Sequence, residues 1–229
     1  MAYPSIAAVA ASATPATSTT HLCALPAGIK VGDLLLAVVV CDGDAAMTWP
    51  AGWTAPTNGA GASGTAVRSE ARYRVANGGE GSELEITGGD VAWVSRVWAL
   101  TGHKNTAPEC AAATGTSADA TPPALTPSWG SEATLWLVHA AWDGRPAFTF
   151  WPVPYSRAAR LAPHVADSGG ASGWVQQASA GYARHQIAHA PGPLTSATAA
   201  WRALTIAVEP GLVPNPSIAA RLVDYGVEP

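Results

Sequence analysis

Charged residues are scarce in this sequence. Only 12% of its 229 residues are Asp, Glu, Lys or Arg, whereas an ordinary soluble domain has about a quarter. The net charge of −4 offers no basic field, which excludes nucleic acid as a partner. A surface with so few charges is either built from small polar residues or covered by partner proteins.

Long apolar runs and paired cysteines are also missing. No segment approaches the roughly 18 apolar residues of a membrane-spanning helix, so no membrane partner is expected. The Ala-rich start of the chain lacks a basic region, and we expect no signal peptide. The three cysteines, Cys23, Cys41 and Cys110, have no metal-like spacing. We expect reduced, packed thiols, with an intersubunit disulfide as the alternative.

No recognisable catalytic motif is present. The sequence has no Gly-x-Ser-x-Gly turn, no phosphate-binding loop and no cysteine set beside a histidine. His185 and His189 would form a metal pair on a helix, but their stretch is typical of a strand, where they lie far apart. Asp42, Asp44 and Asp143 fit turn chemistry better than an acid pair or a calcium site. We therefore expect no enzyme activity, no metal and no cofactor.

Two similar apolar runs organise the chain. Residues 33–44 read DLLLAVVVCDGD and residues 132–144 read EATLWLVHAAWDG. Each ends in Asp-Gly and is followed by Trp-Pro, and their β-branched content predicts strands that are buried on both faces. The elements around them follow the same plan, which indicates an internal repeat of residues 1–102 in residues 105–210. Two unrelated β modules with similar alternation are the alternative.

The remaining elements are short alternating segments bounded by Gly, Pro and Asn turns. The sequence predicts strands at 5–11, 17–25, 33–41, 67–75, 84–87 and 91–100, with a turn at 88–90, and then at 109–114, 123–127, 132–142, 174–186, 194–199 and 201–208. In 67–75 the arginines and Glu70 are expected on a solvent-facing side. The fold prediction is all-β: a two-sheet antiparallel β-sandwich, jelly-roll-like, built from two similar four-stranded halves. We expect its core to contain Leu34, Leu36, Val38, Val97, Leu135, Leu137 and Ile206.

Ten tryptophans are the most unusual feature of the composition. Those inside strand patterns are expected in the core: Trp93, Trp98, Trp136, Trp174 and Trp201. A second set lies in or beside two long predicted loops, at 42–64 and 144–173, and consists of Trp49, Trp53, Trp142, Trp151 and Tyr155. If exposed, this second set would suit stacking on sugar rings or a protein contact. The alternative is that these rings fold back and close the open ends of the sandwich.

The chain changes character after residue 210. Pro210, Pro214 and Pro216 stiffen a segment that follows the last predicted strand. We therefore expect one β-sandwich domain over residues 1–210 and a C-terminal extended arm over 211–229. The arm's apolar side chains, Ile218, Leu222, Val223 and Tyr225, would dock in a groove of a neighbouring subunit. A disordered tail is the alternative.

Several short strings in the right order resemble a known group of proteins. They are LPAGI at 25–29, VGDLLL at 31–36, WPAGWT at 49–54, YRVA at 73–76 with Gly78, and ALTIAV at 203–208. The combination is similar to β-domains of tailed-bacteriophage and prophage structural proteins of the virion, fibre and decoration types. The resemblance covers nearly all of residues 4–210 and implies a virion component without enzymatic activity.

Two function classes follow. The first is a structural subunit of a virion, as capsid decoration, head fibre or tail-associated protein, assembled in the host cytoplasm. Its partners would be other virion proteins and further copies of itself in a homo-oligomer. The second is a carbohydrate-binding or host-adhesion module that uses the loop tryptophans to hold a glycan.

Overall fold

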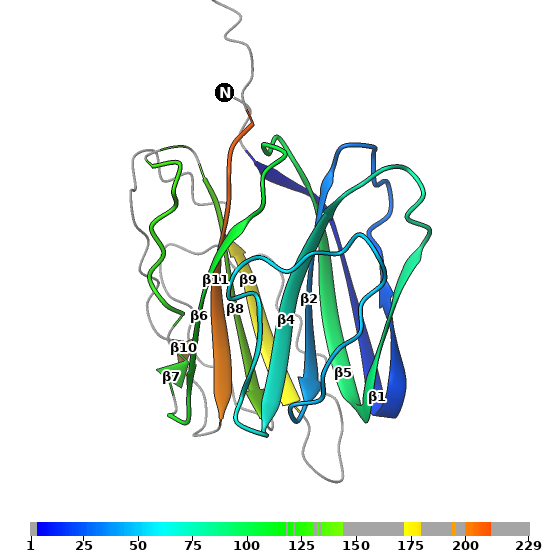
Figure 1. The fold of residues 1–229 in the computed structure, drawn as a ribbon, viewed down its shortest axis with the longest axis vertical. Helices are drawn as coiled ribbons and strands as arrows, with labels where there is room; N and C mark the ends of the chain where they lie inside the picture. The colour runs from blue at the N-terminus through cyan, green and yellow to red at the C-terminus, as the bar shows by residue number, and fades with distance from the viewer. Residues whose placement is uncertain are drawn as a thin grey trace, which may run out of the picture.

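The protein is built from antiparallel β-strands (Figure 1). The structure is a computed structural model that describes residues 4–117, 119–120, 122–130, 132, 134–143, 172–179, 194–195 and 200–211, and none of these lies in a helix. The strands are β1 (Ser5–Ala24), β2 (Leu34–Asp42), β3 (Ala60–Ser63), β4 (Val67–Val75), β5 (Glu83–Thr101), β6 (Glu109–Gly115), β7 (Asp119–Ala120), β8 (Leu135–Asp143), β9 (Ser172–Ser179), β10 (Leu194–Thr195) and β11 (Trp201–Val208). The all-β prediction is confirmed.

Two sheets contain most of these strands. The first has the order β1-β5-β2-β4-β3 and the second the order β6-β11-β8-β9, while β7 and β10 form a small separate pair. Figure 1 shows the two larger sheets packed together, with β4 of the first near β8 and β11 of the second. Contacts of β4 with β8 and β11 join the sheets in a sandwich-like arrangement.

The core lies between the two sheets. Leu34, Leu36 and Val38 of β2 pack in one cluster with side chains of the second sheet. The partners from β8 and β11 are Leu135, Leu137, Leu204, Ile206 and Val208. Each of the seven predicted core residues is at most 2% exposed, so the core prediction is confirmed. Val97 lies on the opposite face of the first sheet, where it packs with Leu35, Ala37 and Val39.

Strands β1 and β5 form one long ribbon that folds back on itself. They pair from one end to the other, with register shifts between Thr14 and Thr20. The backbone N–H of Ala24 donates to the Ser12 hydroxyl at 2.7 Å, which places the C-terminal end of β1 against its middle. The predictions of two separate strands at 5–11 and 17–25, and of a turn between 84–87 and 91–100, are therefore wrong.

Glycine explains why a strand, not a turn, passes through 88–90. A Cβ on Gly88 would lie 2.7 Å from the Ala46 carbonyl oxygen and 2.7 Å from the Trp93 ring. The glycines thus let β5 bend closely around its neighbours at a bulge, where residues 88–90 have no partner on β1 and pairing resumes at Val91. The bend carries Cys23, Leu84 and Ile86 over the outer face of the first sheet, where they are buried.

The outer face of the second sheet is covered by the segment after β7. The Thr205 hydroxyl on β11 donates to the Pro123 carbonyl at 2.6 Å, and Leu125 and Trp129 pack on Trp136, Val138 and Ala207. The predicted strand at 123–127 is wrong, because the described residues 122–130 run as irregular chain with a turn at 128–129. In contrast, the predicted limits 67–75 and 201–208 agree with β4 and β11.

Candidate functional site

In the described ranges, no three His, Cys, Asp or Glu side chains come together as a metal-binding group. His21 and His139 are almost fully buried. Burial lowers the pKa of His21 to about 4, and burial together with the charges of Arg202 and Arg96 lowers that of His139 to about 3. Both rings are neutral at physiological pH, as is typical of core histidines. His185 and His189 lie outside the described residues.

The predicted loop aromatics do not form an exposed cluster in the described part of the chain. Trp53 is 6% exposed, and Trp142 is 0% exposed. Trp142 lies within β8, not in a loop, and packs with Trp201 and Ala203. The proposal of exposed rings is therefore wrong for these two tryptophans, because each fills a gap in a core. Trp151 and Tyr155 lie outside the described residues, as do the arm residues Ile218, Leu222, Val223 and Tyr225.

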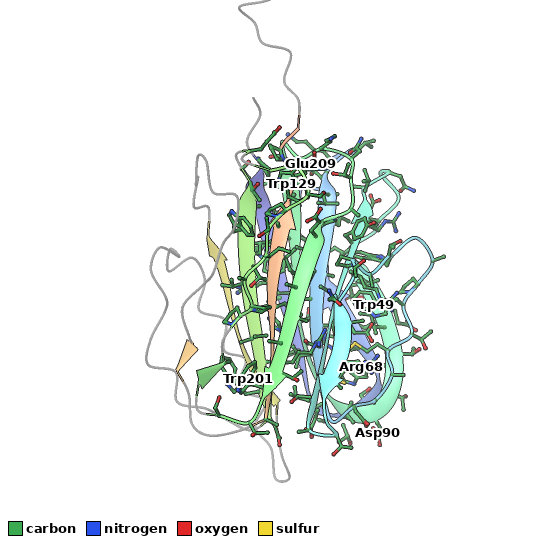
Figure 2. All side chains as sticks on the ribbon, turned by 60° about the vertical axis from the view of Figure 1, so that its left-hand side comes forward. Trp49, Arg68, Asp90, Trp129, Trp201 and Glu209 are labelled. Atoms are coloured by element: carbon green, nitrogen blue, oxygen red, sulfur yellow. The ribbon has the colours of Figure 1, made fainter. Side chains whose placement is uncertain are left out.

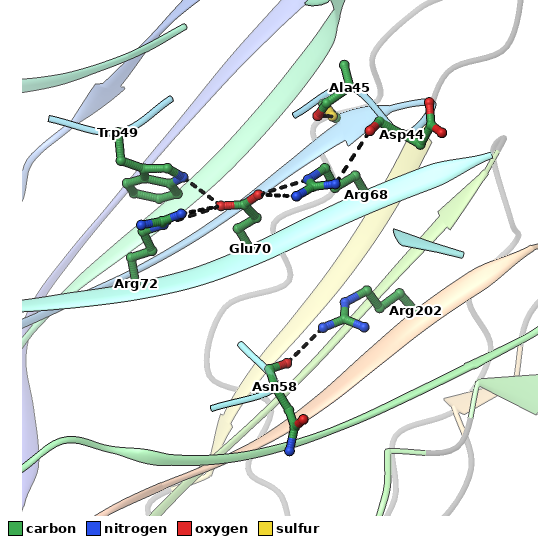
Figure 3. Close-up of polar contacts among 9 residues, drawn as sticks. Asp44, Ala45, Trp49, Asn58, Arg68, Glu70, Arg72 and Arg202 are labelled. Carbon is green, nitrogen blue, oxygen red and sulfur yellow. Dashed lines mark hydrogen bonds and ion pairs between the residues drawn. The ribbon is translucent and has the colours of Figure 1, made fainter. Parts of the chain in front are cut away.

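Trp49 is half-buried, and its ring is held from several directions (Figure 3). Its indole N–H donates to Glu70 Oε2 at 2.9 Å. The Arg72 guanidinium lies 5.3 Å from the ring centroid, and the Trp53 ring lies 6.0 Å away, tilted by 42°. A ring covered in this way leaves little surface for a ligand. Trp49 folds back as the alternative interpretation proposes, but it covers the outer face of the first sheet and does not close an end of the sandwich.

Glu70 is the centre of this network. Its side chain is 1% exposed and accepts from Arg68 at 2.8 Å and from Arg72 at 3.1 Å. The prediction that this side of β4 faces solvent is wrong, because the loop that carries Trp49 and Trp53 lies over it. The carboxylate accepts from donors with both oxygens, so Glu70 fixes the loop on the sheet.

Two buried arginines lie between the sheets. Arg202 on β11 donates to the Asn58 carbonyl at 2.8 Å, a contact that joins the second sheet to a loop of the first (Figure 3). Burial lowers the pKa of Arg202, and burial lowers that of Arg96 to about 10. Arg96 therefore remains charged near neutral pH. Such groups favour one relative placement of the sheets, because any other leaves a cation unpaired.

The three cysteines are free thiols. Cys23 and Cys41 are 0% exposed and Cys110 is 5% exposed. Burial raises the pKa of each thiol to about 12. These cysteines pack as small apolar groups, and their burial gives no support to an intersubunit disulfide.

One hollow of this structure was not expected from the sequence. A cavity of about 510 Å³ is lined by Trp129, Glu109, Glu209, Ser128, Thr106, Thr57, Leu125 and neighbouring residues. Figure 2 shows Trp129 and Glu209 close together at one end of the molecule, with Trp201 and Asp90 at the other. Trp129 fits neither the strand patterns nor the long loops. The turn signal Pro127-Ser128-Trp129-Gly130, which places a large ring beside a surface turn, is the feature that could have identified it.

Neither a search of protein-family models nor a search of curated proteins finds a match for this chain. Among the described residues, no helix has the length and apolar character needed to cross a membrane. The function is accordingly inferred from the chain's own residues.

Proposed function

We propose that this protein is a non-enzymatic structural subunit of a phage or phage-like particle: a capsid decoration, head-fibre or tail-associated protein. It acts through contacts with other virion proteins and with further copies of itself. The observation that carries the proposal is the open edge of the first sheet. An edge strand presents unpaired N–H and C=O groups, and monomeric proteins protect such edges, most often with lysine or other charges.

Strand β1 has no charged protection of this kind, although Pro15 and several register shifts interrupt it. Within the described residues it pairs with β5 alone and forms the edge of its sheet. Its twenty residues contain no Lys, Arg, Asp or Glu. Val9 is 40% exposed, and Ala7 and Ala13 are exposed beside it. The regular part of this edge, residues 8–14, is uncharged and partly apolar and suits addition of a strand from a neighbouring subunit.

We also propose that the sandwich is jelly-roll-like and arose by duplication. In the first sheet, the first strand of its half (β1) lies beside the closing strand (β5), which lies beside the central apolar strand (β2) and then the alternating strand (β4). The second sheet has the corresponding strands of the second half in the same order, β6-β11-β8-β9. The registers support this: β2 pairs Leu34 with Leu100 of β5, and β8 pairs Leu135 with Val208 of β11. On this proposal, residues 1–210 are one domain with an internal repeat, and 211–229 is an arm that docks on a neighbour.

Lysine substitutions on the edge test the assembly role. The double variant Val9→Lys/Ala13→Lys places two charges on β1, and Val31→Lys is the control, because Val31 is 74% exposed in a loop. We expect the edge variant to keep its circular dichroism spectrum and to lose self-association and co-sedimentation with particles. The control is expected to retain both. Edge variants that still associate and attach at wild-type levels would contradict the proposal.

The non-enzymatic part is tested separately. The full chain is incubated with polysaccharides and with peptidoglycan, and released products are measured. We expect no turnover, because no nucleophile–base set was found in the sequence. Turnover that a single carboxylate substitution abolishes would show that the protein is a hydrolase.

A further inference from the structure

The cavity beside Trp129 combines an aromatic platform with hydrogen-bonding groups. Its volume of about 510 Å³ lies within the range of small-molecule sites, about 300–1,000 Å³. It is formed where three segments meet: the start of β6 with the chain before it, the turn at 128–129, and the residue after β11. Thr57, from the loop between β2 and β3, completes the wall. The site therefore exists only when the two sheets are packed together.

The Trp129 ring is held in place before any ligand arrives. Its indole N–H donates to the Thr134 hydroxyl at 2.8 Å, and the ring packs against the cluster of Trp136, Val138 and Ala207. The ring is nevertheless only half-buried and lines the cavity. A fixed, partly exposed indole is a good platform for an apolar ring face, because little side-chain entropy is lost when the ligand stacks.

Both carboxylates at the cavity already have partners. The Glu209 carboxylate accepts from Lys104 Nζ and from the Thr106 hydroxyl, each at 2.6 Å. The Glu109 carboxylate accepts from the backbone N–H of Ser128 at 3.1 Å and from the Ser128 hydroxyl. Each carboxylate has about four acceptor positions, so both retain capacity for further donors. Lys104 balances the charge of Glu209, while Glu109 is paired with neutral donors only. The free acceptor positions of both carboxylates suit a ligand with many hydroxyl donors, and their charge disfavours an anionic ligand.

We propose that this cavity binds one neutral sugar residue of a glycan. The C–H face of a pyranose ring stacks on Trp129, and its hydroxyls donate to Glu109 and Glu209 and exchange hydrogen bonds with Thr57, Thr106 and Ser128. This site differs from the loop aromatics considered in the sequence, and it does not depend on the particle role proposed above. A second hollow of about 330 Å³, lined by residues 25–29, 78 and 80–82, has no aromatic side chain in its wall and provides an internal control.

The test begins with the full chain on an array of neutral and charged glycans. The best binder is then titrated by calorimetry against Trp129→Phe, Trp129→Ala and Glu109→Gln. We expect the phenylalanine variant to retain binding within about threefold, and the alanine variant to lose about tenfold or more. Glu109→Gln should weaken binding about tenfold, because a charged acceptor is replaced by a neutral one. The matched control is Glu80→Gln in the second hollow, which should leave the affinity unchanged.

The outcomes separate cleanly. A neutral glycan whose affinity falls in Trp129→Ala and Glu109→Gln but not in Glu80→Gln supports the proposal. Because Trp129 also packs on the sheet, the alanine variant could be unfolded. In that case the glycan affinity of Glu109→Gln alone tests the proposal. Three results overturn it: no glycan bound above background, binding that neither variant changes, or selective binding of cationic ligands. Particle attachment is measured independently, so failure here leaves the assembly proposal standing, and the reverse also holds.

Discussion

Replacing Glu70 by alanine should destabilise the protein more than almost any other single change on the first sheet. The carboxylate is 1% exposed and accepts from two guanidinium groups and one indole. Alanine would leave Arg68 and Arg72 on the same side of β4 without their shared counter-charge. It would also leave the Trp49 N–H without an acceptor beneath the loop.

The expected loss follows from the burial of the partners. Removing one member of a buried ion pair costs about 3–5 kcal/mol. The arginine side chains here are 23% and 24% exposed, so water solvates part of each freed charge and reduces the cost. We expect Glu70→Ala to lower the free energy of unfolding by about 2–4 kcal/mol. Glu70→Gln keeps one acceptor oxygen and should lose about half as much.

Urea denaturation followed by circular dichroism gives the required free energies. The matched control is Glu85→Ala, which removes an exposed glutamate from β5 and should cost less than about 0.5 kcal/mol. A double-mutant cycle with Trp49→Phe should show a coupling energy of about 0.5–3 kcal/mol. Hydrogen exchange should also accelerate at Thr48 and Thr54, whose backbones bridge the loop to Thr87 and Tyr73. A Glu70→Ala variant within about 0.5 kcal/mol of wild type would refute the reasoning.

Four further predictions concern the core, acid stability, thiols and arm. Leu36→Ala should cost about 2–5 kcal/mol in urea denaturation, because Leu36 is 0% exposed between the sheets. The folded-state pKa of His21 is about 4, below its unfolded value of about 6.5, so the unfolded state binds a proton first as the pH falls. The free energy of unfolding should therefore be unaffected by His21 above about pH 6.5 and fall by about 3 kcal/mol by pH 4. The acid slope of the unfolding free energy should flatten in His21→Gln. The three cysteines should react with a thiol reagent only after denaturation, and fast labelling of the native protein would show that they are accessible. Deleting residues 211–229 should change monomer stability by less than about 1 kcal/mol and reduce particle attachment; full attachment would contradict a docking arm.

The sequence predicts the central strands well because their signals are local. Strands β2, β8 and β11 are mainly apolar runs that are buried on both faces. Such runs can be identified as strands without knowing which neighbouring strands pair with them. The long ribbon was divided wrongly for a physical reason. Pro15 and the glycines at 88 and 89 carry the composition of turns, yet in this fold they bend continuous strands.

The site was less predictable, because burial of a side chain depends on which loop lies over it. Alternation in 67–75 correctly indicates two faces of β4, but it cannot show that Trp49 returns to cover Glu70. Trp142 ends the predicted strand at 132–142 and lies beside a predicted loop, whereas β8 extends through Asp143 and its ring is buried. The sequence pattern does not single out Trp129, because Trp129 and Glu209 line one cavity only after folding brings together segments eighty residues apart in the chain.

Localisation of the protein on purified particles tests the central proposal most directly. Particles produced by the genome that encodes this chain would be banded on a density gradient, quantified by mass spectrometry and labelled with gold-conjugated antibody. The proposal predicts that the protein bands with the particles at a fixed, stoichiometric copy number, and that gold lies at one repeated position on head or tail. Protein found only in the soluble fraction, with unlabelled particles of normal composition, would contradict it.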